Sequence, residues 1–313
     1  MGCNGNVYHI PVLLKEVLNG LDSTGKRKVI VDATAGGMGH SSQLAKTLPS
    51  DGTLICIDQD AEALTKNEKF IKENKCRIEF IHDNFANIKG ILHRLNIDKT
   101  DAVLADLGVS SYQIDSPQRG FSYTKDAPLD MRMNQSQKRD AYHVVNNYTP
   151  ARLQEIIQEF GEERYAKAIT AAIVKNRPLK TTGELAKVIT DAVLASYYKT
   201  GGHPAKRTFQ AIRIEVNREL EMLERFLTDA AEMLSLGGRI AVITFHSLED
   251  RIVKRTFKHL STECICPPKT PKCICNHKAT LKILTKKPIE PTSDEVTKNP
   301  RATSAKLRIA ERI

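Results

Sequence analysis

Two stretches of this 313-residue chain combine carboxylates with glycine, and each directly follows an apolar run. Residues 32–41 read DATAGGMGHS, and residues 106–111 read DLGVSS. A carboxylate such as Asp106 can accept the N–H groups of an amine on a base, which localises the nitrogen lone pair and turns it into a nucleophile. Asp106 could equally cap a helix or bind a cofactor, so the chemistry depends on what the first stretch holds.

The glycines of the first stretch indicate a cofactor loop. A dinucleotide site needs the pattern G-x-G-x-x-G, so that backbone closes on a pyrophosphate. The spacing of Gly36, Gly37 and Gly39 does not fit that pattern. S-adenosylmethionine carries no phosphate and needs glycine only for close backbone approach, with an acidic residue, here Asp32, to organise its amino group. The loop therefore favours S-adenosylmethionine.

Asp58 is the second cofactor candidate. It ends the apolar run at residues 53–58, 26 residues after Asp32, near the spacing at which a carboxylate binds ribose hydroxyls. An Asp at a strand end is often a helix cap instead, and Asp60 could cap equally well.

The elements that must position these loops alternate as strand and helix. Apolar runs at residues 29–31, 53–58, 77–81 and 102–105 predict strands, separated by helical stretches that include 41–48, 61–74 and a stretch ending at Leu95. A helix over residues 8–21 precedes them. The economical fold is an α/β, doubly wound parallel sheet.

The alternation stops after Ser111. Residues 149–196 are strongly helical, a break at residues 201–204 follows, and a long helix is expected to reach Leu236. Residues 239–244 then predict another strand, with two short ones at 281–284 and 306–310. We therefore expect a helical domain at 116–211, inserted into a sheet domain formed by 1–115 and 212–313.

The formal net charge is +10, and nine of these charges lie in residues 250–313, which hold 15 Lys and Arg against 6 Asp and Glu. A basic protein of this kind favours an acidic partner, most commonly nucleic acid. The sequence has neither a membrane-length apolar run nor a signal-peptide pattern, so we expect a cytoplasmic protein with no membrane partner and reduced cysteines.

Seven stretches in order resemble the bacterial 16S ribosomal RNA cytosine-N4 methyltransferase family, over nearly the whole chain. They are residues 32–41, 106–113, 119–122, 128–133, 206–213, 244–251 and 299–306. The resemblance implies a class I methyltransferase, Rossmann-like sheet interrupted by a helical substrate-recognition domain. It also implies methyl transfer from S-adenosylmethionine to N4 of a decoding-region cytidine, within the small ribosomal subunit.

Motif positions carry over the family's cofactor contacts. Besides Asp32 and Gly37 of the loop, they are Met38, Gly39, His40, Asp58, Phe85 (beside the adenine), Asp106 and Gln113. Many members have glycine at the position of Met38, and a backbone contact survives that difference. Relatives that methylate amines often carry an Asp/Asn-Pro-Pro-aromatic motif at the position of Asp106, which this chain lacks, so the group that organises the amine stays open.

Substrate contacts are expected from several further side chains. His246 is a catalytic candidate that could face the base or a phosphate, or serve as a hydrogen-bonded structural residue. Tyr112 or Phe121 could stack on a flipped cytosine or belong to a core. The candidates for contacts with the RNA backbone are Lys206, Arg207, Arg213, Arg251, Lys254 and Arg255.

Four cysteines, Cys264, Cys266, Cys273 and Cys275, have the density of a zinc site. Their Cys-x-Cys pairs are tighter than the usual Cys-x-x-Cys, the loop between them is six residues, and the family's chemistry needs no metal. We therefore expect an exposed loop without a metal ion.

The primary hypothesis is in-line methyl transfer without a covalent intermediate. A DNA cytosine-N4 methyltransferase is the enzymatic alternative, and a ribosome-assembly factor that binds the cofactor without turnover is the alternative of another class. A two-fold homodimer is the ordinary expectation for a soluble enzyme.

Overall fold

The computed structural model describes residues 11–22, 27–65, 70, 73–193, 202–267, 270 and 272–313. The chain divides into two compact units. The sheet unit comprises Met1–Gly108 and Leu220–Ile313, and the helical unit comprises Val109–Glu219. No helix in the described ranges has both the length and the apolar character that a bilayer crossing requires.

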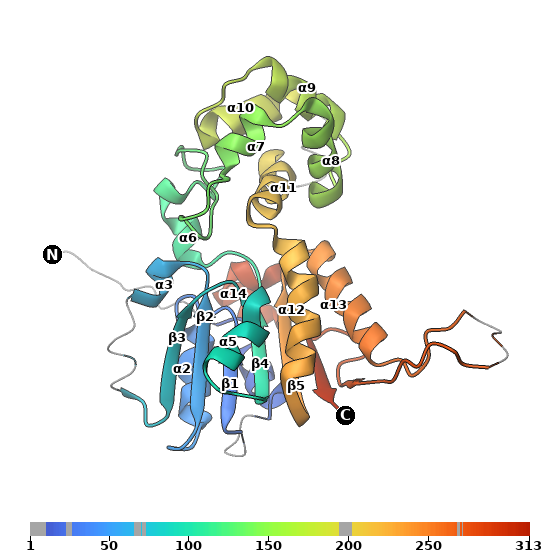
Figure 1. Cartoon of the computed structure of the whole chain (residues 1–313). Coiled ribbons are helices and arrows are strands. Elements are labelled where there is room, and N and C mark those ends of the chain that lie inside the picture. Colours follow the sequence, from blue (N-terminus) through green and yellow to red (C-terminus); the bar gives the residue numbers. More distant parts are fainter. Residues whose placement is uncertain are drawn as a thin grey trace. The chain divides into compact units, whose positions relative to one another are not determined.

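The sheet unit is built on seven strands in the order β3-β2-β1-β4-β5-β7-β6 (Figure 1). Strands β1 to β5 run parallel, and β7 is antiparallel to both β5 and β6. Their bounds are β1 Val29–Asp32, β2 Thr53–Asp58, β3 Arg77–His82, β4 Thr100–Asp106, β5 Leu234–Thr244, β6 Leu281–Ile283 and β7 Lys306–Arg312. The parallel α/β fold expected from the sequence is confirmed, with an antiparallel edge.

Strand β1 pairs with β2 on one side and β4 on the other. Starting from β1, the chain first adds β2 and β3 on one side of the sheet and then adds β4 and β5 on the other side. In open α/β sheets, ligands bind beyond the carboxyl ends of the strands at such a switch point. The two acidic loops follow β1 and β4, so both lie at this position.

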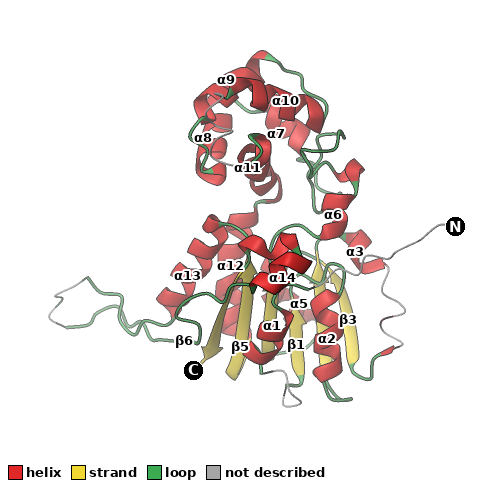
Figure 2. Ribbon diagram, turned by 180° about the vertical axis from the view of Figure 1, so that it is seen from behind, coloured by secondary structure: helices red, strands yellow, loops and turns green. Residues whose placement is uncertain are grey.

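Helices cover both faces of the sheet. Figure 1 shows α5 (Ile88–Arg94), α12 (Glu219–Met233) and α13 (Ser247–Leu260) on one face, where Phe226 and Phe257 join an apolar core with the strands. Figure 2 shows α1 (Leu14–Gly20), α2 (Gly39–Thr47) and α14 (Ser293–Lys298) on the other. The central strands are apolar along nearly their whole length because both faces are buried. The short elements α3 (Ala61–Thr65) and η1 (Phe85–Asn87) follow β2 and β3, and the turn η4 (Pro300–Ser304) precedes β7.

The helical unit has its own apolar core, to which Ile156, Ile169 and Phe209 contribute. Its elements are α6 Ser111–Asp115, η2 Pro117–Arg119, α7 Ala141–Asn147, α8 Pro150–Gly161, α9 Ala166–Lys175, α10 Thr182–Ala192 and α11 Ala205–Asn217. Apolar positions at helical spacing face this core, as the sequence pattern in α8 and α9 predicts.

The prediction of one long helix that reaches Leu236 is wrong in two respects. Arg218 adopts a left-handed φ of 52°, which separates α11 from α12. The residues after Met233 already belong to β5, because Leu234 pairs with Thr100 of β4. Parts of three other expected helical stretches lie outside the described residues, namely 8–10, 66–69 with 71–72, and 194–196. Residue 201 of the expected break also lies outside them.

Glycine substitutions test this backbone. Gly120 has a φ of +68°, and a Cβ there would lie 2.3 Å from the carbonyl oxygen of Pro128. Gly120→Ala should therefore destabilise the protein by about 2 kcal/mol or more in urea unfolding followed by circular dichroism. Gly90 lies within α5 with open space around it, so Gly90→Ala should stabilise by about 0.5–1 kcal/mol. Equal effects of the two changes would contradict the structure.

Candidate functional site

The loop after β1 turns away from β4 toward β2. The Ala33 N–H donates to the Leu104 oxygen of β4 (2.8 Å), and two residues later the Ala35 N–H donates to the Ile57 oxygen of β2 (2.9 Å). The strands therefore part at this point, and the glycine loop continues on the β2 side. At Gly37 a Cβ would meet nothing within 4 Å, so the loop faces open space where a ligand can approach the backbone.

Met38 lies in the turn that starts α2. Its φ of 64° falls in the left-handed region, which explains why glycine suits this position. The Met38 side chain is buried in the core on the α2 face of the sheet. Burial of this thioether offsets the backbone strain, since a buried Met side chain contributes roughly 1.5–3 kcal/mol against about 1–2 kcal/mol for the conformation.

Asp58 holds the loop and keeps acceptor capacity. Its Oδ2 accepts the Gly36 N–H (2.7 Å), and its Oδ1 accepts the Asp60 N–H (2.8 Å). A carboxylate has about four lone-pair sites, so hydroxyl donors can still bind. Burial raises the pKa of Asp58 to about 6, partly opposed by the two backbone N–H donors. The helix cap after β2 is Asp60, whose Oδ1 accepts the Glu62 N–H (3.1 Å).

Both carboxylate oxygens of Asp32 accept hydrogen bonds from residues of the loop and of α2. The Ser41 hydroxyl donates to Oδ2, and the Thr34 N–H donates to Oδ1 (3.2 Å). The residue is 2% exposed, and this burial raises the pKa of its carboxyl, while Ser41 and His40 oppose the rise. Asp32 thereby links the end of β1 to the first turn of α2.

His40 and Asp106 form a pair beside the loop. Nε2 of His40 lies 2.9 Å from the Val12 carbonyl oxygen, which can only accept, so Nε2 carries a proton. Nδ1 lies 3.4 Å from Oδ2 of Asp106.

One carboxylate oxygen of Asp106 is available to a ligand. Its backbone N–H donates to Oγ1 of Thr34 (2.6 Å), which ties the end of β4 to the loop after β1. Oδ1 is buried and has no hydrogen-bond partner in the described part of the chain. Burial raises the pKa of this carboxyl to about 6, although nearby His40 favours the charged form. A buried carboxylate oxygen without a partner costs free energy unless a ligand supplies a donor.

Phe85, the candidate for the adenine contact, opens the turn after β3. Its ring lies edge-on to Phe226 of α12, with centroids 5.1 Å apart. This contact fixes the ring from one side, and Phe85 is only partly buried.

His246 caps α13. Its Nδ1 accepts the Glu249 N–H (3.5 Å), and Oε2 of Glu249 accepts the His246 N–H (3.3 Å) in return, which forms a reciprocal capping box. The same oxygen also accepts the Phe245 N–H (2.8 Å). Nε2 lies 3.2 Å from Oε1 of Glu249. These contacts give His246 the structural role that the sequence analysis left open, and its catalytic role stays a prediction.

The helical unit holds the other candidates. Gln113 is buried in a capping box with Ser110 at the start of α6, whereas Tyr112 is 42% exposed. Phe121 packs against the core of the unit. The described side chains Arg207 and Arg213 both have partners, since Arg207 donates to the Glu162 oxygen (2.9 Å) and Arg213 pairs with both carboxylate oxygens of Glu219.

A basic stripe runs along α13. Arg251, Lys254, Arg255 and Lys258 occupy positions i, i+3, i+4 and i+7, and all four are exposed. Sequence reasoning named the first three and missed Lys258. The helical spacing of the four residues is the signal that could have found it.

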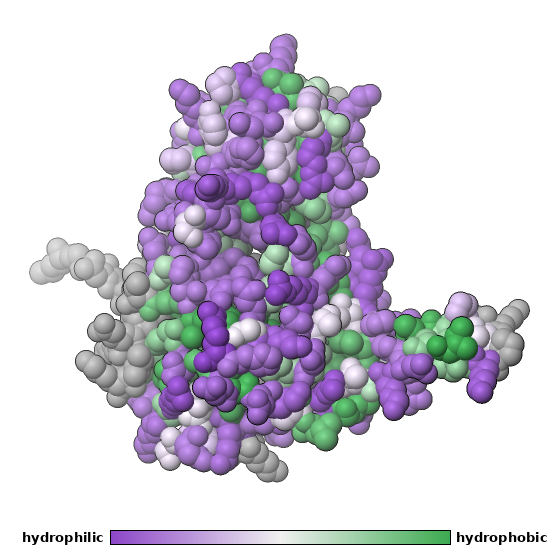
Figure 3. Space-filling view, in the orientation of Figure 1, coloured by the Kyte–Doolittle hydropathy of each residue, from purple (hydrophilic) through white to green (hydrophobic). Residues whose placement is uncertain are grey.

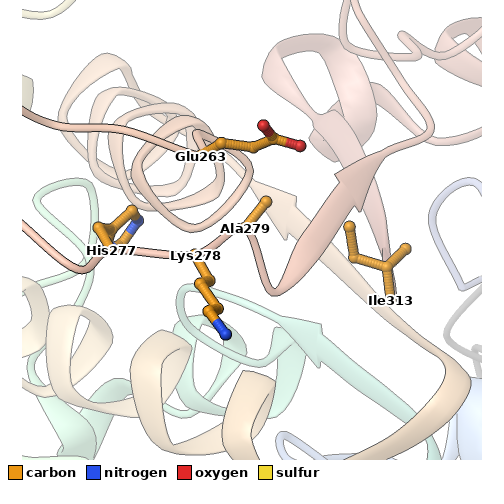
Figure 4. Close-up of a pocket in the computed structure, with 5 residues that line it drawn as sticks. All are labelled: Glu263, His277, Lys278, Ala279 and Ile313. Atoms are coloured by element: carbon orange, nitrogen blue, oxygen red, sulfur yellow. The ribbon is translucent and has the colours of Figure 1, made fainter. Parts of the chain in front are cut away.

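One pocket of about 340 Å³ lies elsewhere in the sheet unit (Figure 4). It is lined by Glu263, His277, Lys278, Ala279 and Ile313. These residues follow α13 and flank the β6–β7 edge, so the pocket is separate from the loops after β1, β2 and β4.

The sheet order, the glycine loop and the three acidic strand ends define a class I methyltransferase that uses S-adenosylmethionine. The chain belongs to the MraW methylase family, which matches residues 6–313.

Two relatives carry the name ribosomal RNA small subunit methyltransferase H. The protein of Clostridioides difficile is 49% identical over 309 residues, which cover 98% of this chain and 99% of the relative. That of Halothermothrix orenii is 49% identical over 308 residues, covering 97% and 98%. A solved rRNA methylase from Streptococcus thermophilus aligns over 96% of this chain and 93% of its own, at 11% identity and a TM-score of 0.41, too distant to bear on function.

Ser41→Ala tests the anchoring of Asp32. Removing the hydroxyl leaves a buried carboxylate oxygen with one donor fewer, so stability at neutral pH should fall by about 1–3 kcal/mol in urea unfolding. The loss should shrink as acidification protonates Asp32. Ser42→Ala is the control, because the Ser42 hydroxyl donates only to the Gly39 oxygen on the same helix. A loss at Ser41 no larger than that at Ser42 would contradict this role.

Proposed function

We propose that this protein transfers a methyl group from S-adenosylmethionine to the exocyclic N4 of a decoding-region cytidine in 16S rRNA. Family membership and the two relatives named above support the coarser part, methylation of small-subunit rRNA. The observation that carries the finer part is the unpartnered Oδ1 of Asp106 beside the glycine loop.

The residues present fit the cofactor. Open space above Gly37 admits close approach of a ligand to the backbone, and Asp58 keeps lone pairs for ribose hydroxyls. Phe85 offers an aromatic ring beyond β3 for the adenine. S-adenosylmethionine supplies a methyl group activated by its sulfonium charge. Gly37, Met38 and Gly39 would hold it through their backbone, with Asp58 and Phe85 fixing the nucleoside end.

Asp106 supplies the acceptor chemistry. The N4 amine of cytosine is a weak nucleophile because its lone pair is delocalised into the ring. Oδ1 of Asp106 accepts an N4 hydrogen and aligns the lone pair for attack, then takes the proton or passes it toward His40. The 3.4 Å separation of Oδ2 and Nδ1 supports this proton route.

The RNA backbone is bound by exposed cations. The stripe formed by Arg251, Lys254, Arg255 and Lys258 on α13 presents four positive charges on one helix face. Phosphate contacts of this kind give affinity without sequence specificity. In the helical unit, Tyr112 is the candidate that is exposed enough to stack on a flipped base.

The decisive experiment is transfer of tritiated methyl to small subunits from cells that lack the enzyme. Nucleoside analysis should then find N4-methylcytidine at one rRNA position. Free 16S rRNA and duplex DNA are assayed in parallel, and labelling of DNA alone would indicate a DNA methyltransferase. Cofactor binding without transfer to any substrate would indicate an assembly factor.

Asp106→Asn should lower kcat at saturating S-adenosylmethionine by about 10²-fold or more, because the amide cannot take the N4 proton. Asp98→Asn is the matched control, since Asp98 is exposed and precedes β4 at the opposite end of the strand. Cofactor affinity is measured separately by calorimetry. Turnover of Asp106→Asn close to that of Asp98→Asn would exclude the acceptor role.

The raised pKa values predict the acid limb of the pH profile. Both Asp106 and Asp58 act as carboxylates, and the pKa of each is raised to about 6. Activity should therefore fall as pH drops through about 6. Protonation of Asp106 should lower kcat, and that of Asp58 should raise the KM for S-adenosylmethionine. An activity that stays constant from pH 8 to pH 5 would contradict both assignments.

A cytoplasmic location is also part of the proposal, because an enzyme that methylates ribosomal subunits would act where those subunits are found. The homodimer expected from the sequence stays a prediction, to be tested by analytical ultracentrifugation of the full chain.

A further inference from the structure

Four cysteine sulfurs meet in the segment between α13 and β6. The Sγ atoms of Cys264, Cys266, Cys273 and Cys275 all lie within 4.8 Å of one another. The Cys264–Cys273 and Cys273–Cys275 distances are both 3.5 Å, and the Cys266–Cys273 and Cys264–Cys275 distances are 4.0 Å and 3.9 Å.

These separations match the edge of a single metal tetrahedron. A Zn–S bond of about 2.3 Å gives an edge of about 3.8 Å between thiolates. A disulfide would require sulfurs about 2.0 Å apart, well below the observed distances. An iron–sulfur cluster distributes its four thiolates over two or more irons, and thiolates on different irons are farther apart than one tetrahedral edge.

The backbone explains how Cys-x-Cys pairs can do this. In an extended chain, residues i and i+2 point to the same side and the residue between them points away. Ile265 and Ile274, the middle residues, are 48% and 78% exposed. Figure 3 shows the resulting apolar patch on the projecting segment. Each pair thus directs two thiols inward and one isoleucine outward, which the usual Cys-x-x-Cys rule does not anticipate.

Backbone groups support the sulfurs. The Ile274 N–H donates to Sγ of Cys266 (3.4 Å), the kind of N–H···S contact that orients a metal-bound thiolate. The base of the segment is fixed separately, because the Thr280 N–H donates to the Leu260 oxygen (2.8 Å) and His277 Nε2 lies 3.0 Å from the His259 oxygen. The cysteines therefore gather beyond an anchored base.

We propose that Cys264, Cys266, Cys273 and Cys275 bind one Zn²⁺ ion as a structural tetrathiolate site. Each thiol releases its proton to solvent as its sulfur binds, so the site carries a net charge of −2, with Lys272 and Lys278 nearby in sequence. Four protein ligands leave no open coordination position, which assigns the ion a structural role.

The ion supplies a cross-link to a segment whose described residues have neither regular secondary structure nor a hydrophobic core. Between 262 and 280 these described residues form neither helix nor strand, and none of them is buried. A metal cross-link between residues 264–266 and 273–275 fixes the segment without a hydrophobic core. The exposed isoleucines then occupy fixed positions on its surface.

The test is metal analysis of the full chain, purified under reducing conditions without chelator. Mass spectrometry of the digested protein should find about one zinc per chain. Titration of the metal-free protein with Co²⁺ should give the intense visible absorption of a tetrahedral tetrathiolate site. The double variant Cys264→Ser/Cys273→Ser should lower the zinc content more than about tenfold.

Cys76→Ala is the control, since Cys76 is a buried cysteine outside the cluster, and it should retain the zinc. Circular dichroism establishes that each variant is folded, and the Co²⁺ spectrum of the unaltered chain is independent of the variants. A full chain with neither zinc nor Co²⁺ absorption, unchanged zinc in the double variant, or an intact mass that reveals disulfides would each overturn the proposal.

Discussion

The structure depends on how β1 shares its backbone hydrogen bonds between two neighbours. Ala33 still bonds to β4, while Ala35 already bonds to β2, so the strands diverge within two residues. The divergence leaves the following loop free to expose its backbone at the switch point, where a Cβ on Gly37 would meet nothing within 4 Å. Parallel pairing on both sides forces the carboxyl ends of β1, β2 and β4 to the same edge, which is why residues far apart in sequence gather there.

Gathering carboxylates at one edge has an electrostatic cost. Burial raises the pKa of Asp32, Asp58 and Asp106, and the negative charge of Asp32 raises the pKa of the other two further. Their mutual repulsion falls when a cation binds beside them. A site of this kind thus favours a positively charged ligand such as a sulfonium over a phosphate, in agreement with the glycine spacing.

The sequence predicted the sheet well because buried parallel strands are continuous apolar runs with acidic or glycine-rich ends. The sequence-based prediction was wrong where the backbone conformation of one residue, or one strand pairing, determines where an element begins or ends. Nothing in the pattern around Arg218 indicates a left-handed residue, and the start of β5 at Leu234 depends on pairing with Thr100. The candidate site residues were predicted from their type and position. The approach of His40 to Asp106 and the meeting of the four cysteines depend on tertiary contacts, which the sequence pattern does not show.

Strand β7 lies between β5 and β6, although it comes last of the three in the chain. On the ribosome, β5 therefore emerges with an unpaired edge and must wait for roughly 60 further residues before its neighbour exists. At about 5–20 residues per second this delay is on the order of 3–12 s. The helical unit, a continuous segment, can fold before then. During synthesis the sheet thus presents an open edge that is prone to aggregation, and its last strand closes it.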